Sequence, residues 1–280
     1  MKIAYLGPPG TFSEEAAIAW GGADADLMPF PSFPAAAEAV ERGEADVALL
    51  PIENSIEGGV TVTMDLLIHQ TPLRIRGELV VPVRHFLAAK PGVRLEDVTV
   101  IVSHPQPLGQ CRQWLRAHLP GAEQVAALST AASVREAVEA PGTCTVGIGT
   151  RRAAELYGAE ILAEDIQDDD SNMTRFIALA YRDTEPTGDD RTSICFTTHA
   201  NVPGSLHGVL TVFADAGLQL TRIESRPIKH ILGEYYFLID IEGHEKDPHV
   251  AATLARARAR CLHLAVFGSY PRFPLERVKG

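Results

Sequence analysis

The stretch AAAEAVERGEADVALLPI, residues 35 to 52, decides the fold, because it joins an alanine-rich helix, a glycine-containing turn and an apolar strand. The helical part carries an E-A-V-E core, and the apolar run after the turn is typical of a buried strand. A similar unit recurs at residues 130 to 149, TAASVREAVEAPGTCTVGIG. Two such units predict two similar lobes, with a crossover near residues 79 to 83 and a return near residues 161 to 166. The alternative is that any two such units look alike, since Ala and Glu are common in helices.

Strand-like and helix-like runs alternate over the first 180 residues, which predicts an α/β domain with a largely parallel sheet. A helix is expected to begin near Thr11, where T-F-S-E reads as a capping box with Glu14 at the third helical position. The predicted strands are residues 2 to 6, 46 to 52, 97 to 103, 123 to 129 and 144 to 149.

The chain divides into two predicted domains. We expect a catalytic domain over residues 1–180, with lobe one at about 1–80 and 163–180 and lobe two at about 81–162. The polar segment YRDTEPTGDD, residues 181–190, reads as a linker. Residues 191–280 then show the order strand, helix, strand, strand, helix, strand, which predicts a ferredoxin-like βαββαβ module.

Composition excludes several classes of protein. The 280 residues are 46% hydrophobic, and the net charge of −11 argues against a general nucleic-acid binder. No apolar run approaches the ~18 residues of a membrane helix, and the N-terminal MKIAYLGPPG leaves no room for the apolar core of a signal peptide. The four cysteines are scattered without a C-x-x-C pair, so we expect free thiols, a cytoplasmic protein and no membrane partner.

The segment DDDSNMTRF, residues 168 to 176, invites a metal interpretation. Asp168, Asp170 and Asn172 fall on positions 1, 3 and 5 of a calcium loop, but position 6 is Met173 instead of Gly and position 12 is Leu179 instead of Glu. We therefore expect the acids to form a solvated turn or helix caps. GPPGTFS lacks the lysine of a phosphate-binding loop, and no H-E-x-x-H or G-x-S-x-G pattern occurs, so no metal or cofactor is predicted.

Polar residues, nearly all of them neutral donors, follow the predicted strands of the first domain, several of them at helix starts. Helix N-termini offer free N–H groups and a partial positive charge, so the pattern predicts a site for an anion bearing carboxylate or phosphate groups. Ordinary helix capping is the alternative for Thr11, Ser129 and Thr130. The residues of this pattern are Thr11, Glu53, Asn54, Ser55, Ser103, Gln106, Gln110, Ser129 and Thr130.

Six motifs resemble, in their order, those of prephenate dehydratases with a C-terminal ACT regulatory domain. They are GPPGTFSEEAA (7 to 17), LLPIENSIEGGV (49 to 60), SHPQPLGQC (103 to 111), STAAS (129 to 133), NMTRF (172 to 176) and IESRP (223 to 227). The resemblance covers essentially the whole chain and is to the monofunctional form. It implies a two-lobed, periplasmic-binding-protein-like catalytic domain that converts prephenate to phenylpyruvate, water and CO2.

The resemblance also implies roles for individual residues. Thr174 is expected to act on the departing hydroxyl, with Arg175 and Phe176 on the same wall of the pocket. Glu53 is a possible acid, although a structural role at the strand end is favoured. The residues expected to bind the carboxylates and orient the ring are Asn54, Ser103, Gln110 and Thr130, with Thr11, Ser55 and Gln106 as further candidates.

In the C-terminal module the resemblance implies an effector pocket for L-phenylalanine and pairing of subunits into a homodimer or homotetramer. The family's G-A-L-V turn reads Gly204, Ser205, Leu206 and His207 here, while its E-S-R-P strand is intact as Glu224, Ser225, Arg226 and Pro227. The altered turn leaves effector affinity and identity open. Two other functions stay open as well: an arogenate dehydratase, and a non-catalytic amino-acid sensor on the same two-lobed fold.

Overall fold

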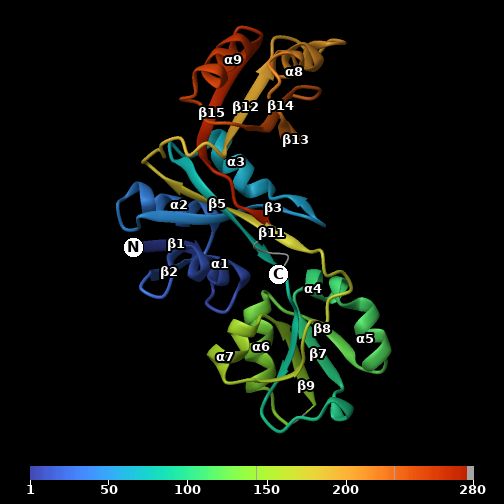
Figure 1. The fold of residues 1–280 in the computed structure, drawn as a ribbon. Coiled ribbons are helices and arrows are strands. Elements are labelled where there is room, and N and C mark those ends of the chain that lie inside the picture. Colours follow the sequence, from blue (N-terminus) through green and yellow to red (C-terminus); the bar gives the residue numbers. More distant parts are fainter. Residues whose placement is uncertain (143, 230, 276–280) are drawn as a thin grey trace. The chain divides into compact units, whose positions relative to one another are not determined.

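The computed structural model describes residues 1–142, 144–229 and 231–275 (Figure 1). The chain forms two compact units. The first holds Met1–Gly58 and Val80–Phe176, and the second holds Gly59–Leu79 and the chain from Ile177 onward. Strands β5 (Arg74–Pro82) and β11 (Met173–Ala180) each run from one unit into the other along their own length.

The first sheet has the order β2-β1-β3-β11-β5, with β4 (Gly58–Gly59) paired to β3. Strand β1 (Lys2–Leu6) lies parallel to both β2 (Asp26–Phe30) and β3 (Val47–Asn54). The helices of this part are α1 (Phe12–Gly21) and α2 (Phe33–Glu41). Ala36, Ala37 and Ala39 of α2 are fully buried, which lets the helix approach the sheet closely.

The second sheet has the order β10-β6-β9-β7-β8. Its strands are β6 (Phe86–Ala89), β7 (Val100–Ser103), β8 (Glu123–Ala126), β9 (Thr145–Gly149) and β10 (Glu160–Ala163). Strand β7 is parallel to β8 and β9, whereas β6 is antiparallel to β9 and β10. The two sheets agree with the two predicted lobes, but the second sheet is not largely parallel: it is mixed, because β6 runs against both of its neighbours.

Helices and one 3-10 turn complete this part of the first unit, and Figure 1 shows α6 and α7 beside the second sheet. They are η1 (Leu95–Asp97), α4 (Pro105–Gln110), α5 (Arg112–His118), α6 (Thr130–Glu139) and α7 (Arg151–Tyr157). Helix α6 lies close to β9, since a Cβ on Gly147 would come within 2.5 Å of the Ser133 carbonyl oxygen. The two helix-turn-strand units predicted from the sequence, α2–β3 and α6–β9, are both present.

The start of α1 differs from the predicted capping box. Thr11 makes no side-chain cap; its hydroxyl donates to the Leu6 carbonyl oxygen at 3.3 Å. The Glu14 carboxylate reaches one residue further back than a box requires and accepts from the Gly10 N–H at 2.6 Å. It also accepts from Arg152 Nε of α7 at 3.3 Å, so this acid ties the first turn of α1 to the lobe that contains α7.

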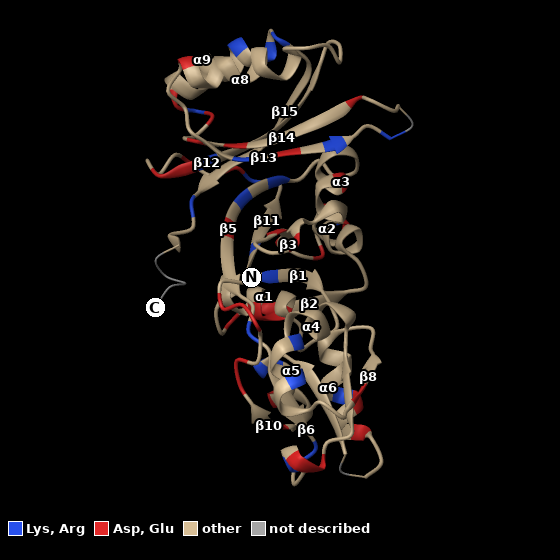
Figure 2. Cartoon of the chain, turned by 90° about the vertical axis from the view of Figure 1, so that its right-hand side faces the viewer, with Lys and Arg blue, Asp and Glu red and all other residues tan. Residues whose placement is uncertain are grey.

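The C-terminal part of the second unit has the order β12, α8, β13, β14, α9, β15, which confirms the ferredoxin-like βαββαβ module. Its sheet has the order β13-β14-β12-β15, with antiparallel neighbours. Helices α8 and α9 cover one face of this sheet around a core that includes Phe196, Phe213 and Ile239 (Figure 2). The bounds are β12 (Asp190–Thr198), α8 (Ser205–Asp215), β13 (Leu220–Pro227), β14 (Tyr235–Glu242), α9 (Pro248–Arg258) and β15 (Cys261–Pro271).

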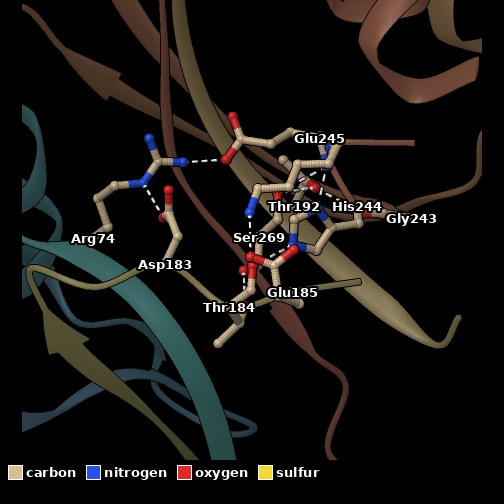
Figure 3. A network of polar contacts seen from close by, with 10 residues as sticks. Arg74, Asp183, Thr184, Glu185, Thr192, Gly243, His244, Glu245 and Ser269 are labelled. Carbon is tan, nitrogen blue, oxygen red and sulfur yellow. Dashed lines mark hydrogen bonds and ion pairs between the residues drawn. The ribbon is translucent and has the colours of Figure 1, made fainter. Parts of the chain in front are cut away.

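The segment predicted as a linker is held by specific bonds (Figure 3). Asp183 pairs with Arg74 of β5 at 2.7 Å, and Arg74 also pairs with Glu245 of the C-terminal module. The Thr184 hydroxyl donates to the Ser269 carbonyl oxygen at 2.6 Å, while the Thr184 carbonyl oxygen lies 3.1 Å from Nε2 of the buried His244. The segment is irregular but firmly bonded, because its backbone and side-chain groups have partners on both sides.

Helix α3 (Thr61–His69) lies against β13 and β14, on the sheet face that α8 and α9 leave uncovered. Asp65 of α3 accepts from Arg226 Nε at 2.7 Å and Nη2 at 3.0 Å, and Lys229 Nζ lies 3.0 Å away. The bonds from Arg226, and then from Lys229, lower the pKa of the Asp65 carboxyl to about 2 despite some desolvation. This fork of bonds fixes α3 on the C-terminal module.

The cysteines and the apolar helices bear on two expectations drawn from composition. All four cysteines are free thiols, as predicted, and burial raises the pKa of the Cys195 thiol to about 12. Over the residues that the structure describes, no helix combines the length and the apolar character that crossing a bilayer requires.

The Asp65–Arg226 pair predicts how stability depends on pH. A carboxyl whose pKa is depressed on folding stabilises the fold above its unfolded pKa of about 3.8, and this contribution is lost as the pH falls towards about 2. Asp65→Asn should therefore lower the free energy of unfolding by about 1 to 2 kcal/mol near neutral pH. The difference from the wild type should narrow below about pH 4. Urea denaturation of both proteins at several pH values measures this difference in the free energy of unfolding.

Asp189→Asn is the matched control, because Asp189 lies in the same unit and pairs with Arg272 at 3.4 Å but is 75% exposed. Its removal should change stability little at any pH. Equal effects of the two substitutions, or an effect of Asp65→Asn that does not depend on pH, would show that the fork does not stabilise the unit.

Candidate functional site

Asn54, the last residue of β3, is held in one orientation by the turn that follows it. Its Oδ1 accepts from the backbone N–H groups of Ile56 and Glu57, both at 3.0 Å. This is a local turn in which a side-chain oxygen binds the backbone two and three residues on. Because the oxygen is used in the turn, the NH2 group of Asn54 must point away from it.

That NH2 group reaches the beginning of β11. Nδ2 lies 3.0 Å from Thr174 Oγ1, 2.8 Å from Asn172 Oδ1 and 3.2 Å from the Met173 carbonyl oxygen. Ser55 strengthens the same contact, since its backbone N–H donates to the Met173 carbonyl oxygen at 2.9 Å. Thr174 Oγ1 accepts from Asn54, so the hydroxyl hydrogen of Thr174 is directed elsewhere and can be donated.

A cavity of about 630 Å³ lies beside this arrangement, wholly within the first unit. Asn172, which accepts from Asn54, is one of its lining residues. The lining comes from the turn after β3, from α4, and from the segment before β11. Its members are Ile56, Glu57, Pro105, Gln106, Gly109, Gln110, Gln167, Asp168, Asp169 and Asn172.

Two residues of the lining, Asn172 and Gln110, have side-chain amide nitrogens that are buried and have no hydrogen-bond partner among the described residues. Asn172 is 1% exposed; its oxygen accepts from Asn54, and its Nδ2 is unpaired. Gln110 has its Oε1 2.8 Å from Nε2 of the buried His85, and its Nε2 is unpaired. Buried donors without partners cost free energy, so these amides are suited to binding an acceptor that enters the cavity.

The other predicted strand-end residues hold the surrounding structure. The Ser103 hydroxyl is fully buried and donates to the Ile148 carbonyl oxygen at 3.0 Å. The Ser55 hydroxyl donates to the Ser171 carbonyl oxygen at 3.2 Å and accepts from the Met173 N–H at 3.0 Å. Thr130 is the first residue of α6, and the cap of that helix is Ser129. Gln106 and Gln110 both line the cavity, and their expected binding roles stay predictions.

Arg175 and Phe176 follow Thr174 along β11. The Arg175 guanidinium pairs with the Glu53 carboxylate through Nε at 3.1 Å and Nη2 at 3.0 Å, and its side chain is 9% exposed. Successive residues of a strand point to opposite faces, so Thr174 and Arg175 face opposite sides of the sheet. Phe176 is buried in the core. The pairing gives Glu53 the structural role favoured from the sequence, and the predicted functions of Arg175 and Phe176 stay predictions.

The three acids before Thr174 have the capping and turn roles expected for them. Asp168 accepts from the backbone N–H groups of Gln113 and Trp114 and so caps α5. Asp169 accepts from the Ser171 N–H and hydroxyl. Asp170 accepts from Arg84 Nη1 at 2.7 Å and from Gln167 Nε2 at 2.8 Å. Among the described residues, no three His, Cys, Asp or Glu side chains gather as metal ligands.

Three residues near the cavity were missed from the sequence: His85, Gln167 and Asn172. The Gln167 Oε1 accepts from the His85 backbone N–H at 3.0 Å, and burial lowers the pKa of the His85 imidazole. Asn172 stands in the NMTRF motif beside the predicted catalytic threonine, and that position was the available signal. His85 and Gln167 lie in no recognisable pattern, because their roles depend on contacts across the unit.

The residues expected to form the effector pocket lie on two elements of the C-terminal module. Gly204, with φ of 90°, precedes α8; Ser205 begins that helix, Leu206 packs against the module's core and His207 is exposed. On β13, Glu224 pairs with Arg222 at 2.5 Å and Arg226 pairs with Asp65, while Ser225 and Pro227 are exposed. The effector roles therefore stay predictions, and two of the E-S-R-P side chains are already engaged by other groups.

Two sheets, a cavity lined by the turn after β3, by α4 and by the segment before β11, and a ferredoxin-like module at the C-terminal side define the class of a two-lobed α/β protein with an appended small domain. A family model described as prephenate dehydratase matches residues 3–184, and one described as ACT domain matches residues 193–259. The chain belongs to the prephenate dehydratase family.

Individual relatives agree with this membership. A prephenate dehydratase of Amycolatopsis methanolica is 41% identical over 97% of this chain and 88% of its own length. The solved structure of a prephenate dehydratase from Arthrobacter aurescens in complex with L-Phe is 40% identical, with a TM-score of 0.90 over 97% of this chain and 90% of that one. A structure described as a novel type of quorum quenching acylase is 30% identical, with a TM-score of 0.89 over 99% of this chain and all of that one.

The contacts of Asn54 predict an unusual pH dependence for one substitution. Asn54→Asp sets a carboxylate oxygen against the oxygens of Thr174, Asn172 and Met173, which raises the pKa of the new acid in the folded state. We expect it to lower the free energy of unfolding by about 2 kcal/mol near neutral pH. The loss should shrink towards about pH 5, because the protonated acid can donate again.

Asn54→Ala is the matched control: it lacks both the donor and the oxygen that holds the turn, so its loss should not depend on pH. Urea denaturation of both variants near pH 7 and pH 5 measures the difference. The same pH response in both variants would contradict the assigned direction of the Asn54 amide.

Proposed function

We propose that this protein is a prephenate dehydratase, which converts prephenate to phenylpyruvate, water and CO2. The observation that carries the proposal is the hydrogen bond from Asn54 to Thr174 Oγ1, next to a cavity in whose lining the amide nitrogens of Asn172 and Gln110 have no partner among the described residues. Family membership over residues 3–184 gives it independent support.

The reaction needs little chemistry from the protein. The electrons of the breaking C–CO2 bond move into the ring, which becomes aromatic as the C–O bond at the opposite ring carbon breaks. The departing hydroxide takes up one proton and leaves as water, so the prephenate dianion and a proton give phenylpyruvate, CO2 and water. The protein has to orient two carboxylates and donate to the leaving oxygen.

Thr174 suits the donor role. Its Oγ1 accepts from Asn54 at 3.0 Å, so it can give its own hydrogen to the leaving oxygen without losing that bond. The Asn54 NH2 group stabilises the negative charge that then develops on Oγ1. The hydroxyl is reprotonated from water after the products leave.

Asn172 and Gln110 suit the binding of a carboxylate. Both amides have their oxygens occupied by protein donors and their nitrogens unpaired. Neutral donors of this kind hold a carboxylate without making an ion pair, which leaves its negative charge available to drive decarboxylation. Ser103, Gln106, Thr11, Ser55 and Thr130 remain candidates for contacts made when the lobes close on substrate.

The alternatives are separable by substrate. Arogenate differs from prephenate in carrying an amine in place of the keto group, so assays with both compounds distinguish the two dehydratases. An acylase activity, the term in the description of one structural neighbour, would call for an activated nucleophile if it proceeded by covalent catalysis. Thr174 Oγ1 is bonded to a neutral amide instead of a base, which argues against that activity here. A non-catalytic sensor would bind without turnover.

Regulation forms the second part of the proposal. We infer that L-phenylalanine binds the ACT module, which we place at residues 191–280 after a catalytic domain at 1–180 and the connecting segment 181–190. The support is the ACT match over residues 193–259 and the L-Phe complex of the Arthrobacter relative. We further propose a cytoplasmic homodimer or homotetramer, in line with the free thiols and with the pairing that the resemblance implies.

Removal of the Thr174 hydroxyl tests the chemistry. Thr174→Val keeps the side-chain shape but cannot donate, so kcat for phenylpyruvate formation from prephenate should fall by a factor of about 10² to 10⁴. Thr174→Ser is the matched control, because it keeps the hydroxyl and should retain most of the activity. Absence of turnover by the wild type would refute the proposed enzyme, and full activity of Thr174→Val would refute only the role of Thr174.

Titration with L-phenylalanine tests the regulation. The effector should lower the rate of the wild-type enzyme and raise its Tm, because a ligand that binds the native state stabilises it. Restoring the family's turn with Ser205→Ala and His207→Val should shift the midpoint of inhibition by about threefold or more. A rate and a Tm that do not respond to millimolar L-phenylalanine would contradict regulation through this module.

A further inference from the structure

The two unpaired amides of the cavity share one arrangement. In each, the carbonyl oxygen is bound by a donor from another segment of the first unit: Asn54 Nδ2 binds Asn172 Oδ1 at 2.8 Å, and His85 Nε2 lies 2.8 Å from Gln110 Oε1. An amide whose oxygen is held in this way has its NH2 group directed to the other side. The orientation of each amide is therefore set by its partner.

His85 is itself fixed from several directions. It is 1% exposed and follows β5 by three positions. Its backbone N–H donates to Gln167 Oε1 at 3.0 Å, and its carbonyl oxygen accepts from the Ile166 N–H at 3.0 Å. Its ring meets the Phe12 ring at an interplanar angle of 82°, with the centroids 5.6 Å apart. The imidazole has little freedom to move or turn.

The tautomer of His85 follows from its surroundings. Nδ1 is buried without a hydrogen-bond partner among the described residues. A hydrogen on Nδ1 would be a buried unpaired donor, which is costlier than a buried unpaired lone pair. The neutral ring therefore carries its hydrogen on Nε2 and donates it to Gln110 Oε1. The Gln110 NH2 group, which is buried and unpaired among the described residues, keeps both hydrogens available for an acceptor that binds beside it.

We propose that His85 is a positioning residue for substrate: it fixes the Gln110 amide with its NH2 group as the donor to a substrate carboxylate. This inference rests on the proposed function and adds a residue that touches neither the substrate nor the reacting atoms. Without the Nε2–H donor the Gln110 amide can turn over, and its oxygen would then repel the carboxylate.

Three substitutions of His85, ranked by their KM for prephenate, distinguish a positioning role from a packing role. His85→Gln places an amide NH2 near the former Nε2 and should keep KM within about threefold of the wild type. His85→Phe keeps the ring and its packing but has no donor, and His85→Asn places its NH2 near the former Nδ1. Both should raise KM for prephenate by about tenfold, with kcat within about twofold. A packing role predicts the reverse order, with Phe nearest the wild type.

A double-mutant cycle shows whether His85 acts through Gln110. In a Gln110→Met background, which removes the amide at similar volume, His85→Phe should raise KM by less than about twofold. The same increase in both backgrounds would overturn the proposal, as would an unchanged KM in His85→Phe alone. His118→Phe serves as the control, since His118 stacks on Trp114 and lies outside the cavity lining.

One measurement tests His85 independently of any activity. Histidine ring nitrogen NMR on the labelled wild-type protein, with His85→Gln to assign the signal, should show hydrogen on Nε2 and a bare Nδ1 near neutral pH. The opposite tautomer would overturn the proposal even if prephenate is turned over. If the wild type does not turn over prephenate, the proposed function fails. The double-mutant cycle of His85 and Gln110 is then measured through the Kd of phenylpyruvate for each variant.

Discussion

The amide of Asn54 is the constraint on which the site depends. Its oxygen holds the turn after β3, and its NH2 group holds the start of β11 through Thr174, Asn172 and the Met173 carbonyl oxygen. One neutral side chain thus joins two segments that lie 118 to 120 positions apart in sequence. The Asn54 NH2 group donates to oxygens, and the Asn54 oxygen accepts from backbone nitrogens. Asp has no NH2 group and Leu has neither group, so either substitution would leave some of these partners without a hydrogen bond, although both side chains are of similar size.

The sequence was sufficient for the repeated helix-turn-strand unit, for the C-terminal module and for the motif that contains Thr174, but it predicted no strand at the positions of β2 and β6. The helix-turn-strand repeat predicted α2–β3 and α6–β9, and the order of elements predicted the C-terminal module, because both rest on local periodicity. The direction of β6 was not predictable, since it depends on where the chain crosses between the two sheets. The capping box at Thr11 failed because Glu14 also meets Arg152, and a contact at that distance in sequence has no local signal.

In the site, too, some residues could be selected from their neighbours in sequence, whereas others depend on contacts between segments far apart in sequence. Asn54 ends β3, whereas Gln106 and Gln110 lie in α4, which follows β7. Position along the chain was the reason for selecting all three, and their binding roles stay predictions. Ser103 and Thr11 satisfied the same rule, but their hydroxyls donate to the Ile148 and Leu6 carbonyl oxygens, so the rule alone does not separate ligand-binding groups from caps. His85 satisfied no rule. Its proposed role rests on one bond to Gln110, which becomes visible only when the fold brings the residue before β6 next to the end of α4.

The backbone contact between Ser55 and Met173 has a consequence for the durability of the protein. An asparagine followed by serine loses its amide over time when the next backbone nitrogen attacks the side-chain carbonyl carbon, and such residues are among the thermally labile ones. In this fold the Ser55 nitrogen donates to the Met173 carbonyl oxygen at 2.9 Å, and the Asn54 side chain is held at both ends. The attack requires that pairing to open first. The hydrogen bond between the Ser55 N–H and the Met173 carbonyl oxygen thus also slows the deamidation of Asn54. We expect the deamidation rate to be limited by local opening of this contact.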